Sequence, residues 1–270
     1  MFFGQNYYIY CMQDQLKVAF IQQELAWENP KQNRKQFKEA IEGISQKVDL
    51  ILLPEMFTTG FTMNAKEQAE TMDGKSVDWM KKLASAKDAA IVGSLIIEDN
   101  SKIYNRLLFV HPDGTIEHYD KRHTFSLAGE DKVYASGMEK LIVDYHGWKI
   151  CPLICYDLRF PVWSRNKEDY ELLLYVANWP KPRIVAWDTL LKARAIENMC
   201  YTVGVNRVGV DEKDNEYCGH STAYDILGNN ISPIRPNKEY VGIITLERNH
   251  LNFYRNKLKF LNDRDTFLIQ

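Results

Sequence analysis

The apolar and polar residues of this chain form short blocks that switch between the period of a strand and that of a helix. Short apolar or alternating runs bounded by turn residues predict strands. We expect about eleven of them, at residues 16–22, 49–54, 90–97, 103–111, 116–119, 138–144, 148–154, 172–177, 201–206, 221–225 and 240–246. Helical spacing of apolar residues predicts helices after Asn29-Pro30 and at 76–88, 184–198 and 247–256.

This order of elements predicts the architecture. Strands alternate with helices through both halves of the chain, which is typical of an α/β fold. About eleven strands exceed what one open, twisted sheet usually holds. We therefore expect two sheets packed face to face, with helices outside each, in one domain over residues 16–270. Residues 124–137 show no clear period and predict a loop, and residues 1–15 form an N-terminal extension of unknown role.

Composition and charge narrow the function classes. The 270 residues carry a formal net charge of −2, which gives no indication of nucleic acid or an anionic membrane as partner. Apolar runs stay well short of the roughly 20 residues of a membrane span. Residues 1–15 lack a basic start and do not predict a signal peptide, and Met12 is an alternative start. We expect no nucleic acid and no membrane as partner.

The five cysteines are odd in number and widely scattered, at Cys11, Cys151, Cys155, Cys200 and Cys218. That distribution argues against a disulfide framework and for a reducing compartment, so we expect a cytoplasmic protein. Cys151 and Cys155 have no second cysteine pair or histidine cluster nearby, which argues against a zinc site. Cys200 and Cys218 are interpreted as structural.

Three reactive side chains directly follow predicted strands. Glu55 follows the run DLILLP, Lys121 follows the strand that ends at Tyr119, and Cys155 follows Ile154. In α/β sheets ligands bind beyond the carboxyl ends of strands, so these side chains can meet in one pocket. Each has a plainer interpretation, because a lone cysteine is usually buried core and charged turn residues are usually solvated. Together they indicate a nucleophile, a base and a cation.

The segments around these residues resemble the nitrilase superfamily of carbon–nitrogen hydrolases. Glu55 in LLPEMFTTGF, Lys121 in YDKRHTF and Cys155 in ICYDLRFP match the order and spacing of its Glu-Lys-Cys triad. Further matches are YVANWP, LLKARAIEN and GHSTAYDILG, and the resemblance spans residues 16–256. It implies a four-layer α-β-β-α sandwich, which agrees with the two sheets expected from the strand count. Within the superfamily the chain is most similar to the ω-amidase branch, whose members hydrolyse the terminal amide of 2-oxo acids such as 2-oxoglutaramate.

The chemistry explains why these residue types are needed. A free thiol with a pKa of about 8.5 is mostly protonated at neutral pH, so Glu55 is expected to take the proton of Cys155. The thiolate attacks the amide carbonyl, and Lys121 with the backbone N–H of Tyr156 is expected to stabilise the oxyanion. Glu55 then protonates the leaving ammonia and activates the water that hydrolyses the thioester. None of these steps needs a metal or an organic cofactor.

Several supporting residues carry alternatives. Glu130 lies where the family often has a second glutamate, and a surface loop acid is the equal alternative. Asp157 and Arg159 are expected to fix the turn after the nucleophile by hydrogen bonds. Phe61 and Trp179 are candidates to line the pocket. A substrate carboxylate needs a cationic partner, for which Arg159 and Arg183 are the candidates.

The leading hypothesis is thus a cysteine-dependent amidase acting on 2-oxoglutaramate or 2-oxosuccinamate. Alternatives are another activity of the superfamily, such as N-carbamoyl amine or nitrile hydrolysis, and a non-catalytic thiol protein that uses Cys155. The chain lacks a Cys-x-x-Cys pair, which weighs against a redox role. Family members commonly pair through the helices that follow the nucleophile and YVANWP, so the resemblance implies a homodimer or a higher homo-oligomer.

Overall fold

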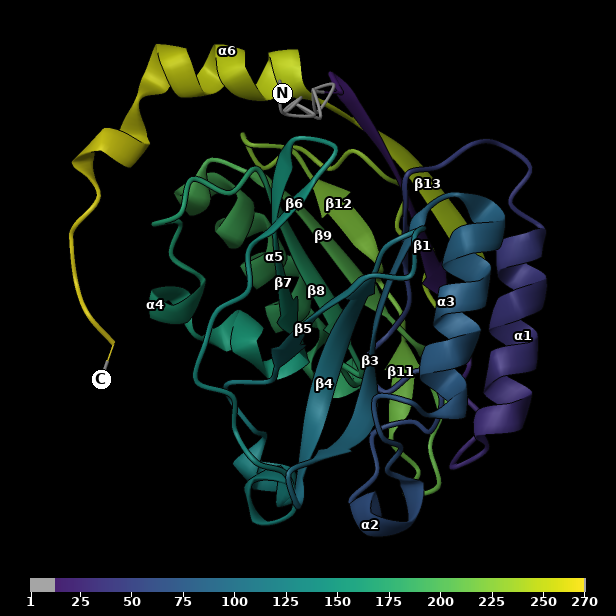
Figure 1. Cartoon of the computed structure of the whole chain (residues 1–270). Helices are drawn as coiled ribbons and strands as arrows, with labels where there is room; N and C mark the ends of the chain where they lie inside the picture. The colour runs from purple at the N-terminus through teal and green to yellow at the C-terminus, as the bar shows by residue number, and fades with distance from the viewer. Residues whose placement is uncertain (1–12, 270) are drawn as a thin grey trace, which may run out of the picture.

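The computed structural model describes residues 13–269, and within them two β-sheets pack face to face (Figure 1). The first sheet has the strand order β13-β1-β2-β3-β4-β5. Its strands are β1 (Gln15–Gln22), β2 (Leu50–Leu52), β3 (Ala90–Asp99), β4 (Lys102–Val110), β5 (Ile116–Asp120) and β13 (Tyr240–Glu247). The second sheet has the order β12-β9-β8-β7-β6. Its strands are β6 (Val143–Tyr145), β7 (Trp148–Ile154), β8 (Leu172–Ala177), β9 (Tyr201–Asn206) and β12 (Thr222–Tyr224).

Helices cover the outer face of each sheet, which confirms the predicted four-layer sandwich. In Figure 1, α1 (Pro30–Glu42) and α3 (Lys75–Lys87) stand side by side against the first sheet, and α5 (Ile184–Asn198) lies against the second. The helix α6 (Arg248–Leu258) crosses one end of the sandwich. Short α-helical turns form α2 (Ala65–Gln68) and α4 (Pro161–Ser164). The 3₁₀ turns are η1 (Ser126–Ala128), η2 (Glu130–Lys132), η3 (Cys155–Arg159), η4 (Lys181–Arg183) and η5 (Phe260–Asp263).

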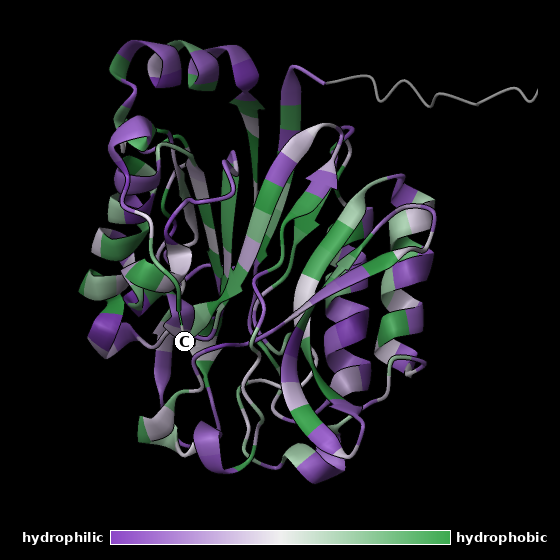
Figure 2. Ribbon diagram, turned by 60° about the vertical axis from the view of Figure 1, so that its left-hand side comes forward, coloured by the Kyte–Doolittle hydropathy of each residue, from purple (hydrophilic) through white to green (hydrophobic). Residues whose placement is uncertain are grey.

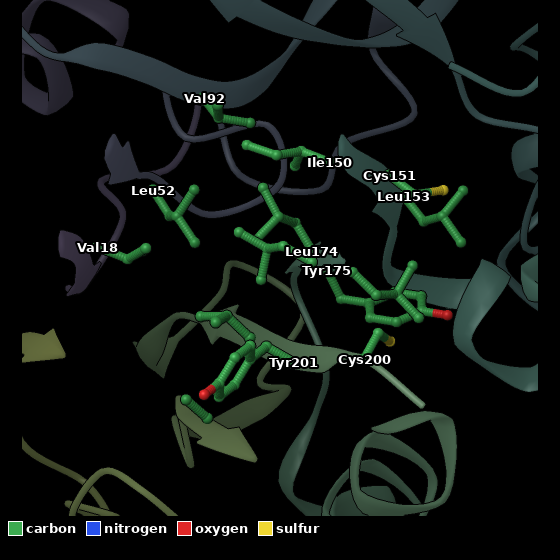
Figure 3. Close-up of a cluster of buried hydrophobic side chains, with 14 of the residues drawn as sticks. Val18, Leu52, Val92, Ile150, Cys151, Leu153, Leu174, Tyr175, Cys200 and Tyr201 are labelled. Carbon is green, nitrogen blue, oxygen red and sulfur yellow. The ribbon is translucent and has the colours of Figure 1, made fainter. Parts of the chain in front are cut away.

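The alternation of side chains along the strands divides the first sheet between two cores. Val18 on β1, Leu52 on β2 and Val92 on β3 point into the space between the sheets, toward Ile150 and Leu174 of the second sheet (Figure 3). The neighbouring residues of these strands pack on the other side against α1 and α3. Each fully buried aliphatic side chain contributes about 1.5–3 kcal/mol relative to exposure. Figure 2 shows apolar positions along the buried strands and both polar and apolar positions along the outer helices.

Local signals place the helices. The side chain of Asn29 accepts a hydrogen bond from the backbone N–H of Gln32 at 3.1 Å, and Pro30 opens α1, as the sequence predicts. Helix α5 approaches β9 closely because residue 204 is glycine. A Cβ there would lie 2.6 Å from Leu191 and 2.7 Å from Trp187, so only glycine permits this spacing. In the part of the chain that the structure describes, no helix has the length and apolar character needed to cross a bilayer.

Some element predictions were wrong in detail. The strand expected at 138–144 is confined to Val143–Tyr145, because residues 138–142 have no strand partner. The loop expected at 124–137 contains the turns η1 and η2. A short ribbon of β10 (Val208–Val210) and β11 (Glu216–Cys218) was not predicted, since three-residue strands are too short to show a period. The expected extension at 1–15 lies mostly outside the described residues.

Candidate active site

The ends of two sheets place the three predicted reactive residues in one pocket. Strands β1, β2 and β3 are parallel, and β5 regains their direction because β3-β4 and β4-β5 are both antiparallel. The carboxyl ends of β2 and β5 therefore lie at the same edge of the first sheet and carry Glu55 and Lys121 beyond it. Cys155 follows the end of β7 in the facing sheet. All three residues line one cavity of about 230 Å³.

Lys121 is the centre of a buried ionic cluster. Its Nζ lies 2.8 Å from Oε1 of Glu55 and 2.9 Å from Oε2 of Glu130, and all three side chains are within 1% of full burial. Burial by itself lowers the pKa of Lys121, but the carboxylates of Glu130 and Glu55 outweigh it and raise that pKa above its ordinary value. The lysine is therefore a fixed cation at neutral pH. The ring of Phe61 lies 5.2 Å from Nζ and covers one side of the cation.

Glu130 is not the surface acid that the sequence left open as an alternative. It begins η2, is fully buried, and binds Lys121 through both carboxylate oxygens. The backbone N–H of Phe125 donates to its Oε2. Burial raises the pKa of the Glu130 carboxyl, while Lys121 lowers it and Glu55 raises it further. Because Lys121 is the single cation between Glu55 and Glu130, the cluster has a net charge of −1 when both carboxyls are ionised.

Cys155 sits at a sharp change of backbone direction. Its φ is +41°, in the left-handed region that residues with a side chain adopt at a cost, and it opens η3 directly after β7. The sulfur lies 3.9 Å from the backbone carbonyl oxygen of Asn178. Burial raises the pKa of the Cys155 thiol well above its ordinary value, the Glu55 carboxylate raises it further, and Lys121 opposes both. The thiol is thus neutral at rest and needs an adjacent base to become a thiolate.

Two asparagines that the sequence reasoning missed hold Glu55 in place. The Nδ2 of Asn105 donates to Oε1 of Glu55 at 2.8 Å, and the backbone N–H of Asn178 donates to Oε2 at 2.8 Å. Asn178 also donates from its side chain to the backbone oxygen of Glu55. Their places in the sequence could have identified them. Asn105 interrupts the apolar pattern of β4, and Asn178 directly follows the apolar run of β8.

The four residues predicted to line the pocket or bind the substrate all border it, and they are Phe61, Arg159, Trp179 and Arg183. Tyr156, whose backbone N–H is the predicted oxyanion donor, borders it as well. The backbone N–H of Trp179 donates to Asn206 at 2.8 Å, and its indole N–H donates to the backbone oxygen of Arg183 at 2.8 Å, which fixes the ring. The segment from Asp211 to Tyr217 adds a wall that the sequence reasoning missed, because the ribbon carrying it was not predicted.

Asp157 and Arg159 have different surroundings. Asp157 is fully buried and accepts from the backbone N–H of Ile154 at 3.1 Å, so it fixes the turn as expected. Arg159 instead lies over the ring of Trp179, with 4.9 Å between its guanidinium carbon and the ring centroid. Arg183 lies 5.3 Å from the ring centroid of Phe125. Among residues 13–269 neither arginine has a carboxylate within ion-pair distance.

Comparison with known sequences confirms the family that the motifs indicated. The profile of the carbon–nitrogen hydrolase family matches residues 17–256, and the chain belongs to that family. It is therefore a hydrolase of carbon–nitrogen bonds.

Individual relatives narrow the comparison. The chain is 45% identical to the omega-amidase YafV of Yersinia enterocolitica, over 94% of this chain and 98% of that protein. It is 36% identical to the 2-oxoglutaramate amidase of Bacillus subtilis, over 78% and 83% of the two chains. Among solved structures, XC1258 of Xanthomonas campestris, a CN-hydrolase superfamily protein with an arsenic adduct in its active site, superimposes with a TM-score of 0.93. The identity is 40%, and the match covers 96% of this chain and 100% of that one.

A more distant structure shows the same fold. Nit3 of Saccharomyces cerevisiae, a member of branch 10 of the nitrilase superfamily, superimposes with a TM-score of 0.82 at 21% identity. This match covers 92% of this chain and 96% of that one.

Proposed function

We propose that this protein is a cysteine-dependent ω-amidase that hydrolyses the terminal amide of a small 2-oxo acid, 2-oxoglutaramate or 2-oxosuccinamate. The observation that carries the proposal is the meeting of Glu55, Lys121 and Cys155 at one cavity. The relatives named omega-amidase and 2-oxoglutaramate amidase support the substrate class. The product is the dicarboxylate, and ammonia is released.

The reaction follows from the protonation states of the cluster. Glu55 takes the thiol proton of Cys155, and the sulfur attacks the amide carbonyl carbon, so a C–S bond forms and the carbonyl π electrons move to oxygen. The ammonium of Lys121 and the backbone N–H of Tyr156 stabilise that oxyanion. When the carbonyl re-forms, the C–N bond breaks and Glu55 gives its proton to the nitrogen, which leaves as ammonia. A thioester remains on Cys155.

The same residues catalyse the second half-reaction, in which the thioester is hydrolysed. Glu55 takes a proton from water, and the water oxygen attacks the thioester carbonyl. The C–S bond then breaks to release the acid, and Glu55 returns its proton to the sulfur of Cys155. Glu130, which is not among the lining residues in the described part of the chain, holds the ammonium of Lys121 through both carboxylate oxygens. No step calls for a metal or an organic cofactor.

The charge of the pocket supports a carboxylate-bearing substrate. Arg159 and Arg183 border the cavity, and each guanidinium stacks on an aromatic ring. A guanidinium in this position can bind a carboxylate through two parallel hydrogen bonds. The amide at the other end of such a substrate would then face Cys155.

A panel of substrates tests the proposal. We expect kcat/KM for 2-oxoglutaramate, measured by ammonia release, to exceed the values for glutamine, a simple nitrile and an N-carbamoyl amino acid by at least ~10-fold, about 1.4 kcal/mol of transition-state discrimination. Cys155→Ala should abolish turnover without loss of fold. Cys151→Ala, four residues earlier and fully buried, is the matched control that should retain activity. Equal rates on the nitrile would favour another activity of the superfamily, and ammonia release by Cys155→Ala would exclude thiol catalysis.

Assembly and location are also proposals. We propose a homodimer formed through α5, where Val185 and Ile196 are 76% and 45% exposed although they are apolar. Light scattering should give twice the chain mass at micromolar concentration, and Val185→Glu should give the monomer. We place the protein in the cytoplasm, in keeping with its free thiols at Cys151, Cys155, Cys200 and Cys218. Cell fractionation tests that location.

A further inference from the structure

Asn105 contacts the buried ionic cluster of Glu55, Lys121 and Glu130. The apolar pattern of its strand would predict an apolar core residue at this position. It lies on β4, where Leu107 and Phe109 point into the space between the two sheets. Residues two apart on a strand share a face, so Asn105 points the same way. Its side chain is fully buried, and it is not among the residues that line the cavity in the described part of the chain. A buried amide at this position therefore acts on other protein groups.

The amide of Asn105 joins both carboxylates of the cluster. Its Nδ2 donates to Oε1 of Glu55 at 2.8 Å and to Oε1 of Glu130 at 3.2 Å. Its backbone oxygen accepts from the backbone N–H of Lys121 at 3.0 Å, so this one residue contacts all three charged members. The opposite amide orientation would place its oxygen against two carboxylate oxygens, which excludes that orientation. Its Oδ1 is buried and has no hydrogen-bond partner among the described residues. The two hydrogen bonds from Nδ2 are therefore formed at the cost of leaving this oxygen unpaired.

The hydrogen bonds distinguish the two oxygens of Glu55. Oε1 accepts from Lys121 at 2.8 Å and from Asn105 at 2.8 Å, which occupies both of its lone-pair directions. Oε2 accepts from the backbone N–H of Asn178 at 2.8 Å and keeps one direction open. A proton taken from Cys155 or from water can therefore bind only at Oε2 without breaking an existing hydrogen bond.

We propose that Asn105 is a positioning residue that reserves Oε2 of Glu55 for proton transfer. By donating to both carboxylates, it also stabilises the doubly ionised form of a cluster that holds only one cation. The inference rests on the proposed role of Glu55 as the general base. It predicts that loss of the amide donor changes the pH at which Glu55 becomes active, while leaving substrate binding nearly unchanged.

The groups that face this cluster limit what else could titrate. Besides Glu55 and Glu130 they are Lys121, Cys155 and Tyr134. Lys121 stays charged, and burial raises the pKa of Tyr134, so that phenol stays neutral. Its hydroxyl donates to the backbone oxygen of Thr62 at 2.6 Å. Between pH 5 and 8 a change in the acid side of the rate profile therefore reports the carboxyls.

Two variants test the proposal. Asn105→Leu removes both donations and keeps a side chain of similar size, and Asn105→Asp keeps the shape but adds a third carboxyl. Loss of hydrogen bonds to the ionised form raises the pKa of a carboxyl. We expect the acid limb of kcat/KM to move up by about one pH unit in Asn105→Leu, and further in Asn105→Asp. At pH 7 kcat should fall by up to about 10-fold in Asn105→Leu and by more in Asn105→Asp, while KM changes less than about 3-fold.

A buried asparagine elsewhere provides the matched control. Asn166 is fully buried and donates to the backbone oxygens of Tyr170 and Asn198 at 2.9 Å each. Asn166→Ala should lower the midpoint of urea unfolding without moving the pH profile. An equal displacement of the profile in Asn166→Ala, or an unmoved profile in folded Asn105→Leu or Asn105→Asp, would overturn the proposal.

A second measurement separates this inference from the proposed activity. Alkylation of Cys155 by iodoacetamide depends on transfer of its proton and needs no substrate, with Cys155→Ala giving the background from the other thiols. We expect its pH profile to move upward in both Asn105 variants as well. A wild-type protein that releases no ammonia would refute the amidase proposal, while the alkylation profiles would still decide the role of Asn105. Unmoved alkylation profiles in both variants would refute that role whatever the activity.

Discussion

The carboxylate of Asp157 binds His123 twice, through the backbone N–H at 3.1 Å and through Nδ1 at 2.7 Å. Asp157 lies two residues after Cys155, and His123 lies two residues after Lys121. The contact therefore joins the turn that carries the thiol to the segment that carries the lysine, across the two sheets. The other oxygen of Asp157 accepts from the hydroxyl of Tyr119 at 2.7 Å and from the backbone N–H of Ile154 at 3.1 Å.

Loss of this carboxylate should weaken the whole site. Asp157→Ala leaves the buried donors of Tyr119 and Ile154 unpaired, at about 1–3 kcal/mol for each such group. We expect the free energy of unfolding in urea to fall by about 2–5 kcal/mol, with reduced kcat in the protein that remains folded. Asp144→Ala, an exposed aspartate on β6, should change neither quantity. Wild-type stability in Asp157→Ala would show that the network contributes little.

Glu55→Gln tests the base directly. The amide keeps the size of the side chain but cannot accept and return a proton, so acylation and deacylation should both stop. We expect no burst of ammonia in a single-turnover experiment with enzyme in excess over 2-oxoglutaramate. Glu168→Gln, whose carboxylate pairs with Lys140 on another part of the surface, should behave as wild type. A normal burst with Glu55→Gln would remove Glu55 from the first half-reaction.

Lys121→Met should cost at least ~10²-fold in kcat, the usual effect of removing one oxyanion donor. It should also make stability depend on pH, because two buried carboxyls then lack their cation. Burial already raises the pKa of Glu130, and loss of Lys121 raises it further. A carboxyl whose pKa is raised in the folded state contributes its full stabilisation of the folded protein at a pH below its pKa in the unfolded state, about 4.3 for Glu. That contribution is lost as the pH rises through its pKa in the folded state.

Urea unfolding at two pH values measures this effect. We expect the stability difference between wild type and Lys121→Met to be larger at pH 8 than at pH 5, by about 1.4 kcal/mol for each unit of pKa displacement that lies between them. Lys82→Met removes an exposed lysine that pairs with Asp78 on α3 and should show no such dependence. A difference that is equal at both pH values would mean that the carboxyls are neutralised in another way.

Arg183→Met and Arg159→Met should change selectivity for a substrate carboxylate. We expect kcat/KM for 2-oxoglutaramate to fall about 10- to 100-fold in whichever variant removes the carboxylate partner, while the value for an uncharged amide stays within about 3-fold. The comparison within one variant cancels any general loss of activity. Lys181→Met, an exposed lysine paired with Glu216, is the control. If neither arginine variant alters the ratio, the carboxylate is bound elsewhere in the pocket.

The fold could be predicted largely because its long strands are buried and because Asn29 and Pro30 mark the start of α1. The run from Leu172 to Ala177 is apolar at every position and is fully buried, so its pattern and its environment agree. Short elements escaped prediction where tertiary contacts rather than pattern create them. The strand expected at 138–144 shows the limit, because only Val143 and Asp144 of that range pair with β7.

The site could be predicted only in part, for a related reason. Glu55, Lys121 and Cys155 are reactive residue types at strand ends, so topology and chemistry both point to them. Asn105 lies inside a strand and is neither acid, base nor nucleophile, so its position matters only once β4 is placed beside the cluster. Glu130 could not be assigned by pattern, because η2 buries it within a stretch that has no apolar period.

The left-handed backbone of Cys155 has a consequence for how this sequence can change. An L-residue in that conformation costs about 1–2 kcal/mol relative to glycine, and the surrounding turn has to supply that free energy. Selection for stability alone would therefore favour glycine at position 155. Under the proposed thiol mechanism, stability and activity therefore oppose each other at this position, and Cys155→Gly should unfold at higher urea concentration while releasing no ammonia.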